Sequence, residues 1–284
     1  MFRKIWGVAR IEYMGFLTSK RVFLMLFAFI FLAEDVVGKM GKLSIEQGFI
    51  LGRFEPFILL FSYKIHAMIV PIVFVVMMSN FPSNEKSGYF IMSRIHRKAW
   101  LFGEVIFAGM VGLTFILFLL LGTMAWVWKN SSFLTTWSPY MSELYMDYPE
   151  VYALNNQLFI KTETLAQGEP VTVMLHSVGL MFLYLVFLAL LLMFFKLLDL
   201  KKAGIFIAVV ITIIGVAMDD YSRIMKWFFP IMQSIYESHF CSYYAETETP
   251  LYFSYIYFGV LIVGLFVINT WLVKRYAVTE VDAI

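Results

Sequence analysis

Long apolar runs separated by short polar segments dominate the chain. Six runs approach the length of a membrane-crossing helix, at residues 22–37, 57–78, 101–128, 171–195, 203–218 and 251–273. A bilayer core takes about 20 residues of helix, and only helices or closed barrels satisfy their backbone hydrogen bonds in lipid. The alternation of period two that marks a barrel strand is absent. The pattern therefore predicts an all-α integral membrane protein with six transmembrane helices.

The first 20 residues follow a different pattern. Apolar side chains recur at helical spacing on one face, namely Phe2, Ile5, Trp6, Ala9, Tyr13 and Phe16, and the bases Arg3, Lys4 and Arg10 lie off it. This pattern predicts an amphipathic helix at 1–20 that rests on the inner membrane surface. The alternative is a plain basic anchor. No small-residue cleavage site follows, so we expect the segment to be retained.

Composition and charge place the chain in the membrane and orient it there. The chain is 61% hydrophobic and 15% charged, well outside the range of soluble domains. Most of its Lys and Arg residues lie at 1–21, 79–100, 196–202 and 274–284, whereas most acids lie elsewhere. The positive-inside rule then predicts a single multi-pass transmembrane domain over 1–284, with both termini and the loop 79–100 cytoplasmic.

Two sizeable segments are expected on the outer side. Residues 129–170 are acidic and rich in Tyr, Ser and Thr. Residues 219–250 contain Trp227, Phe228, Phe229 and Ile231 around Pro230, which is too apolar for a free loop. We expect a short re-entrant helix that dips back into the outer leaflet there. The alternative is an ordinary aromatic belt at the membrane interface.

Three charges fall inside predicted spans. Glu34 and Asp35 follow twelve apolar residues of the first span, and Lys64 lies seven residues into the second, at a similar predicted depth. Charges within a bilayer usually face the bundle interior and pair with one another, so we expect an ion pair between Lys64 and one of the acids. The alternative is that Lys64 extends outward to the headgroups. The pattern does not distinguish structural bracing from substrate contact.

Motifs for catalysis, nucleotide binding or metal binding are missing. The chain has no G-x-x-x-x-G-K-[ST], no H-E-x-x-H and no G-x-S-x-G, and its four histidines fall on different segments. The single cysteine excludes an internal disulfide and a cysteine-based metal site. We therefore expect no catalytic residue, no metal, no cofactor bound by this chain and no nucleic-acid partner.

The loop between the second and third runs resembles a known pattern. It reads Glu85, Gly88, "YFIM" at 89–92, "SRIHR" at 93–97 and "LFGE" at 101–104. This order of acid, glycine, apolar turn and arginine group is similar to the coupling loop of type-2 ABC transporter permeases. The topology also resembles that family. The chain departs from it at Ser93, where proline is usual, in the first-span acids and in the long segment 129–170.

The resemblance implies a mechanism and partners. Two permease subunits, identical or different, would form the path, each docked on a separate cytoplasmic P-loop ATPase that binds ATP and Mg²⁺. Glu85, Gly88, Arg94 and Arg97 would form the coupling contact. The chain itself would not be an enzyme, and the exported substrate could be a peptide, a drug or a lipid. The alternative reading is a polytopic scaffold or channel subunit with no ATPase partner.

Overall fold

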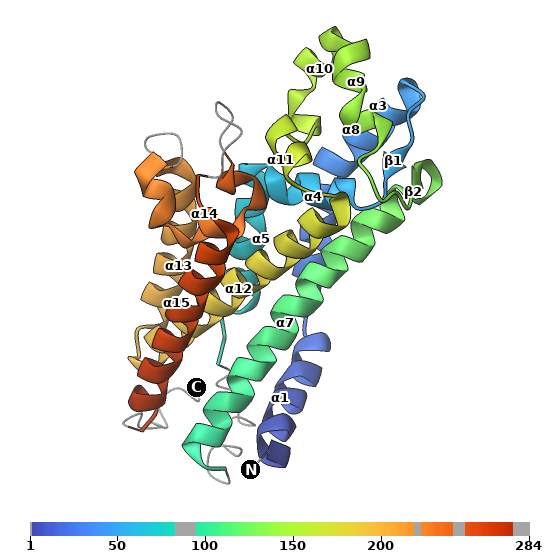
Figure 1. Cartoon of the computed structure of the whole chain (residues 1–284). Coiled ribbons are helices and arrows are strands. Elements are labelled where there is room, and N and C mark those ends of the chain that lie inside the picture. Colours follow the sequence, from blue (N-terminus) through green and yellow to red (C-terminus); the bar gives the residue numbers. More distant parts are fainter. Residues whose placement is uncertain (1, 83–94, 219–222, 241–247, 275–284) are drawn as a thin grey trace.

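Long helices form most of the molecule (Figure 1). The computed structural model describes residues 2–82, 95–218, 223–240 and 248–274. Within them, four helices are long and apolar enough to cross a membrane: α7 (Arg97–Trp126), α12 (Pro170–Leu197), α13 (Lys201–Met218) and α15 (Leu251–Leu272). They confirm the last four predicted runs to within a few residues. A membrane protein built from helices is thus supported.

The second predicted span is not straight, which corrects the expectation for 57–78. It consists of α4 (Glu55–Ser62) and α5 (Lys64–Met77), which meet at an angle of 86°. The bend lies at Tyr63, whose backbone is extended. Every residue of α4 is buried, so its hydrophobicity reflects packing inside the protein. The bent pair raises the number of candidate spans among the described residues from four to at most five.

The first predicted span continues further than its apolar run. α2 (Val22–Leu32) is followed by a π-helical segment, η1 (Ala33–Gly38), and then by α3 (Lys39–Glu46). None of these pieces is long enough to count as a span by itself. The expected six spans are therefore not confirmed. The apolar part of this helix stops at Ala33, after only ~18 Å of rise.

The N-terminal helix α1 (Phe2–Leu17) packs along α7. A Cβ added to Gly103 would lie 2.6 Å from Cβ of Val8, and the Tyr13 hydroxyl lies 2.7 Å from Oγ1 of Thr114. These contacts are ~16 Å apart along α7. α1 therefore runs alongside α7 (Figure 1). A helix lying flat on the membrane surface would instead contact α7 only near one end. Only part of the predicted apolar face of α1 is buried: Ala9 and Phe16 are buried, whereas Phe2 and Trp6 are exposed.

Polar contacts join the long helices around α12, which touches α7, α13 and α15. The Tyr184 hydroxyl lies 2.7 Å from Oγ1 of Thr212 in α13. Nδ2 of Asn269 in α15 donates to the Leu190 carbonyl at 3.0 Å. Such hydrogen bonds add to close packing, because lipid gives helices no hydrophobic reason to associate.

Short elements form a cap at one end of the bundle, at the top of Figure 1. After η2 (Trp128–Asn130), they are β2 (Ser131–Ser132), α8 (Pro139–Ser142), α9 (Leu144–Asp147), α10 (Pro149–Leu154), η3 (Asn156–Leu158) and α11 (Thr162–Gln167). β2 pairs in parallel with β1 (Leu51–Gly52), with Leu51 opposite Ser131. The predicted segment 129–170 thus folds onto the loop before α4. The first turn of α1 and the last turn of α15 lie at the opposite end.

The described part of segment 219–250 enters the bundle. It forms η4 (Arg223–Trp227), α14 (Pro230–Ser234) and η5 (Tyr236–His239). All five residues of α14 are buried, and a Cβ on Gly215 of α13 would overlap the side chain of Ile231. The glycine lets α14 approach α13 closely. The depth of this segment in a bilayer stays a prediction.

Candidate functional site

A pocket of about 430 Å³ opens where three parts of the chain meet. The bend between α4 and α5, the cap and η5 each supply a wall. We call it the outer pocket and define it by Ser62, Tyr63, Phe159, Lys161, Glu163 and Glu237. Two further lining residues, Tyr152 and Asn156, come from the cap. The pocket exists because the bend at Tyr63 turns α4 away from the axis of α5.

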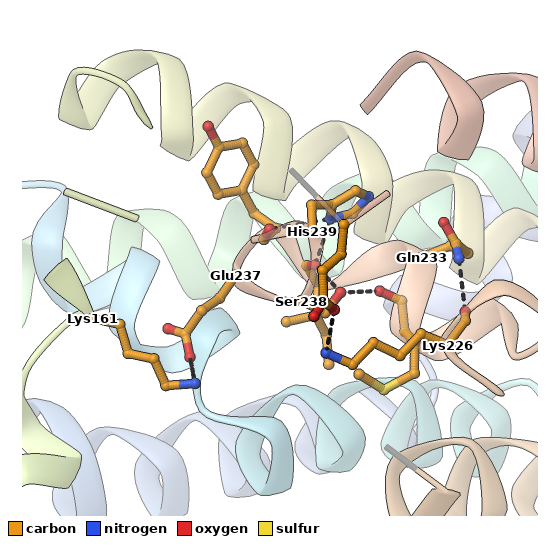
Figure 2. A network of polar contacts seen from close by, with 10 residues as sticks. Lys161, Lys226, Gln233, Glu237, Ser238 and His239 are labelled. Atoms are coloured by element: carbon orange, nitrogen blue, oxygen red, sulfur yellow. Dashed lines mark hydrogen bonds and ion pairs between the residues drawn. The ribbon is translucent and has the colours of Figure 1, made fainter. Parts of the chain in front are cut away.

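An ion pair between Lys161 and Glu237 forms part of the wall of the outer pocket. Nζ of Lys161 lies 2.7 Å from Oε1 of Glu237, and Figure 2 shows the two side chains meeting from opposite sides. The Glu237 side chain is 12% exposed and that of Lys161 is 52% exposed. Burial raises the pKa of Glu237, while Lys161 and the hydroxyl of Ser62, which donates to the carboxylate, oppose that rise.

The position of Glu237 is fixed by the buried residue two places further on. Nδ1 of His239 lies 3.0 Å from the Ile235 carbonyl and 3.1 Å from that of Tyr236. Burial lowers the pKa of His239 to about 4, although these carbonyls favour the charged ring. The ring is therefore neutral near pH 7. It holds the turn of η5 that carries Glu237.

A chain of hydrogen bonds extends from His239 in η5 through Ser254 in α15 to Gln233 in α14 and Lys226 in η4, and Figure 2 shows its link between Gln233 and Lys226. Nε2 of His239 lies 2.7 Å from Oγ of Ser254, and Oε1 of Gln233 lies 2.6 Å from the same oxygen. With a neutral ring whose Nδ1 carries the proton, the single hydroxyl proton of Ser254 is donated to one of these two acceptors at a time. Gln233 in turn donates to the Lys226 carbonyl at 2.7 Å, and the Lys226 amine pairs with Glu248 at 2.9 Å. Ser254 and His239 are fully buried, so this serine–histidine pair cannot reach a substrate. The network is structural.

The structure shows partners for the two predicted intramembrane acids, Glu34 and Asp35. Asp35 in η1 accepts from Nζ of Lys39 at 2.5 Å and lies 2.9 Å from Nε2 of His66. Glu34 pairs with Lys42 at 3.5 Å. The contact from the second predicted span to Asp35 comes from His66, two residues after Lys64, which sequence reasoning missed. An ion pair between Lys64 and either acid stays a prediction.

A second hollow lies beside these acids, with a volume of about 570 Å³. Its floor consists of Phe27, Ile30 and Phe31, and its rim carries charged residues of η1 and α3. A π-helical segment often marks a functional position in a helix. The apolar floor faces outward from α2, however, where contact with lipid already accounts for exposed aromatic side chains.

Of the predicted coupling residues, Glu85, Gly88 and Arg94 lie outside the described residues, and Arg97 lies within them. Arg97 begins α7, and its Nη1 donates to the Lys274 carbonyl after α15 at 2.7 Å. At the start of α13, Nζ of Lys201 donates to Oδ1 of Asn80, which follows α5, at 2.8 Å. These contacts join helix ends at the face opposite the cap (Figure 1).

Neither metal chemistry nor a known relative identifies the site. Within the described residues, no group of three or more His, Cys, Asp or Glu side chains could hold a metal ion. Comparison of the chain with protein-family models, curated proteins and solved structures gave no match. The argument about function therefore rests on the residues and their geometry.

Proposed function

We propose that the chain is the permease subunit of an ABC exporter in a bacterial plasma membrane. One observation carries the proposal: basic helix ends gather on one face, opposite the cap, and they include the start of α7, which follows segment 83–94. Arg97, Lys98, Lys201, Lys202 and Lys274 lie at these ends. A basic face of this kind fits a cytoplasmic docking surface for a separate P-loop ATPase.

The remaining geometry is compatible with a transport path. In this proposal, α2, η1 and α3 together would supply a sixth crossing beside the four long helices and the bent pair. A second permease subunit, identical or different, would complete the path, with both chain termini cytoplasmic. ATP and Mg²⁺ would bind to the ATPase, whose movements would be passed to the bundle through Arg97 and the residues before it. The substrate would be a peptide, a drug or a lipid.

The proposal is tested with the full chain in lipid nanodiscs, alone and co-expressed with candidate P-loop ATPases from neighbouring genes. We expect ATP hydrolysis only in the complex. Reversing Arg94 and Arg97 together to Glu should abolish partner binding and leave membrane insertion intact. Lys129→Glu, an exposed charge reversal in the cap, is the matched control and should bind the ATPase normally.

Two results would overturn the proposal. A contaminant-free chain that hydrolyses ATP alone cannot be the passive half of an exporter. Full ATPase binding by the double variant would reduce the basic segment to a topology signal and favour the scaffold or channel reading.

A further inference from the structure

We propose that the outer pocket binds a guanidinium group on a flexible stem, such as an arginine side chain of a peptide, which replaces Lys161 at Glu237. The inference goes beyond export and holds whether or not an ATPase drives the chain. Three properties of the pocket carry it, namely its size, its charge and its aromatic walls.

The pocket is large enough for such a ligand and reaches a buried acceptor. Its volume of about 430 Å³ falls within the ~300–1,000 Å³ typical of small-molecule sites. Glu237 lies in its wall with only 12% of its side chain exposed. An entering group would therefore meet a carboxylate that is largely withdrawn from water, where an ion pair is screened less than at the surface.

The charges of the pocket favour a cation and make Lys161 replaceable. Glu237 and Glu163 face a single base, Lys161, so the three groups carry a net negative charge when ionised. Lys161 is half exposed on a long, flexible side chain. It can move into solvent, where an ammonium is well hydrated, whereas Glu237 is held by η5 and cannot follow. The anion is fixed and its cation is mobile.

The walls suit a planar cation better than a simple ammonium. Tyr63, Tyr152 and Phe159 line the pocket, and aromatic faces attract guanidinium groups. A guanidinium can also donate two parallel hydrogen bonds to one carboxylate, whereas Lys161 contacts one oxygen of Glu237. The ligand would thus gain contacts that the resident lysine does not make.

The competing explanation is that the ion pair of Lys161 and Glu237 is purely structural and only holds the cap against η5. The two explanations differ in the effect of removing the lysine. If the pair is only a clasp, Lys161→Met and Glu237→Gln both weaken the fold and neither affects a ligand. If Lys161 occupies a binding site, its removal frees Glu237, so the two variants have opposite effects on affinity.

The test measures calorimetric binding of Nα-acetyl-arginine amide to the full chain in nanodiscs. Nα-acetyl-citrulline amide, which has the same shape without the charge, is the control ligand. We expect the arginine probe to bind and the citrulline probe not to bind. Lys161→Met should tighten arginine binding by about tenfold, because the probe no longer competes with an internal cation. Glu237→Gln should weaken it by at least about tenfold.

Glu163→Gln protects the test against a folding failure, because it leaves the pair of Lys161 and Glu237 intact. It should weaken arginine binding by about threefold and keep the wild-type melting temperature. Equal binding of the two probes, absence of arginine binding in both the wild type and Lys161→Met, or weaker binding in Lys161→Met would each overturn the proposal and leave a structural clasp.

Discussion

Replacing Glu55 by glutamine should release the cap from the bent helix α4. Glu55 is fully buried at the start of α4. Its carboxylate accepts three hydrogen bonds, from the Gly52 amide at 2.9 Å, the Ser138 amide at 2.7 Å and the Ser138 hydroxyl at 2.7 Å. All three partners donate, so the ionised carboxylate satisfies each of them. The contacts join α4 to β1 and α8.

The size of the effect follows from the number of donors. Glutamine has one acceptor oxygen, so its amide nitrogen must face a backbone N–H of Gly52 or Ser138. The variant thereby loses a charge-assisted hydrogen bond and leaves a buried donor unpaired, which together cost about 3 kcal/mol. Ser138→Ala removes only the hydroxyl and leaves both amides bonded. This matched control should cost about 1 kcal/mol.

Unfolding by SDS titration in mixed micelles measures these free energies, and limited proteolysis within 129–170 reports on the cap. We expect Glu55→Gln to lower the free energy of unfolding about three times as much as Ser138→Ala and to speed cleavage of the cap. Equal losses in the two variants, or a Glu55→Gln protein as stable as the wild type, would refute the argument that the Glu55 carboxylate satisfies three buried donors. Unchanged cleavage with lower stability would show that the carboxylate does not fasten the cap.

Three further predictions concern other parts of the fold. Gly103→Leu should cost about 1–3 kcal/mol by overpacking, because a Cβ there already lies 2.6 Å from a side chain of α1; Gly7→Ala, whose Cβ would meet nothing, is the control in the same SDS titration. If Lys64 is a partner of Glu34 or Asp35, Lys64→Met should lower detergent stability more than the same change combined with Gln and Asn at positions 34 and 35, since an unpaired intramembrane charge is the costly state; no such difference would show that Lys39, Lys42 and His66 already satisfy the acids. Because burial lowers the pKa of His239 to about 4 from 6.5, its contribution to stability should be complete above pH 6.5 and be lost as the pH falls toward 4. His239→Gln should flatten that decline in melting temperature, and an unchanged pH profile would contradict it.

Continuous apolar runs predicted α7, α12, α13 and α15 well because hydrophobicity and length decide such spans. The bend at Tyr63 could not be predicted from local composition. No glycine or proline marks it, whereas Pro71, which would suggest a break, lies inside α5. The run at 57–78 is apolar on both sides of the bend, because α4 is buried in protein. Hydropathy does not distinguish burial in protein from burial in lipid.

The candidate site was less predictable than the helices. Asp35 was found because a charge within an apolar run stands out, but its partner His66 shows no such contrast. Lys161 and Glu237 are 76 positions apart, in segments that look like polar loops. Their meeting depends on the bend at Tyr63 and on the burial of α14. Sequence periodicity carries no information about such distant contacts.

The cap is fastened at both ends of α4, which links the outer pocket to the bend. At its start, Glu55 accepts from Ser138 of the cap. At its end, Ser62 donates to Glu237, which pairs with Lys161 of the cap. The first contact is wholly buried, whereas the second includes a half-exposed lysine. A cation that displaces Lys161 would therefore release the cap beside Tyr63 and leave it attached at Glu55. α5 begins directly after this bend and leads toward the face opposite the cap. Ligand binding at the pocket would therefore change the contacts that hold the first turn of α5.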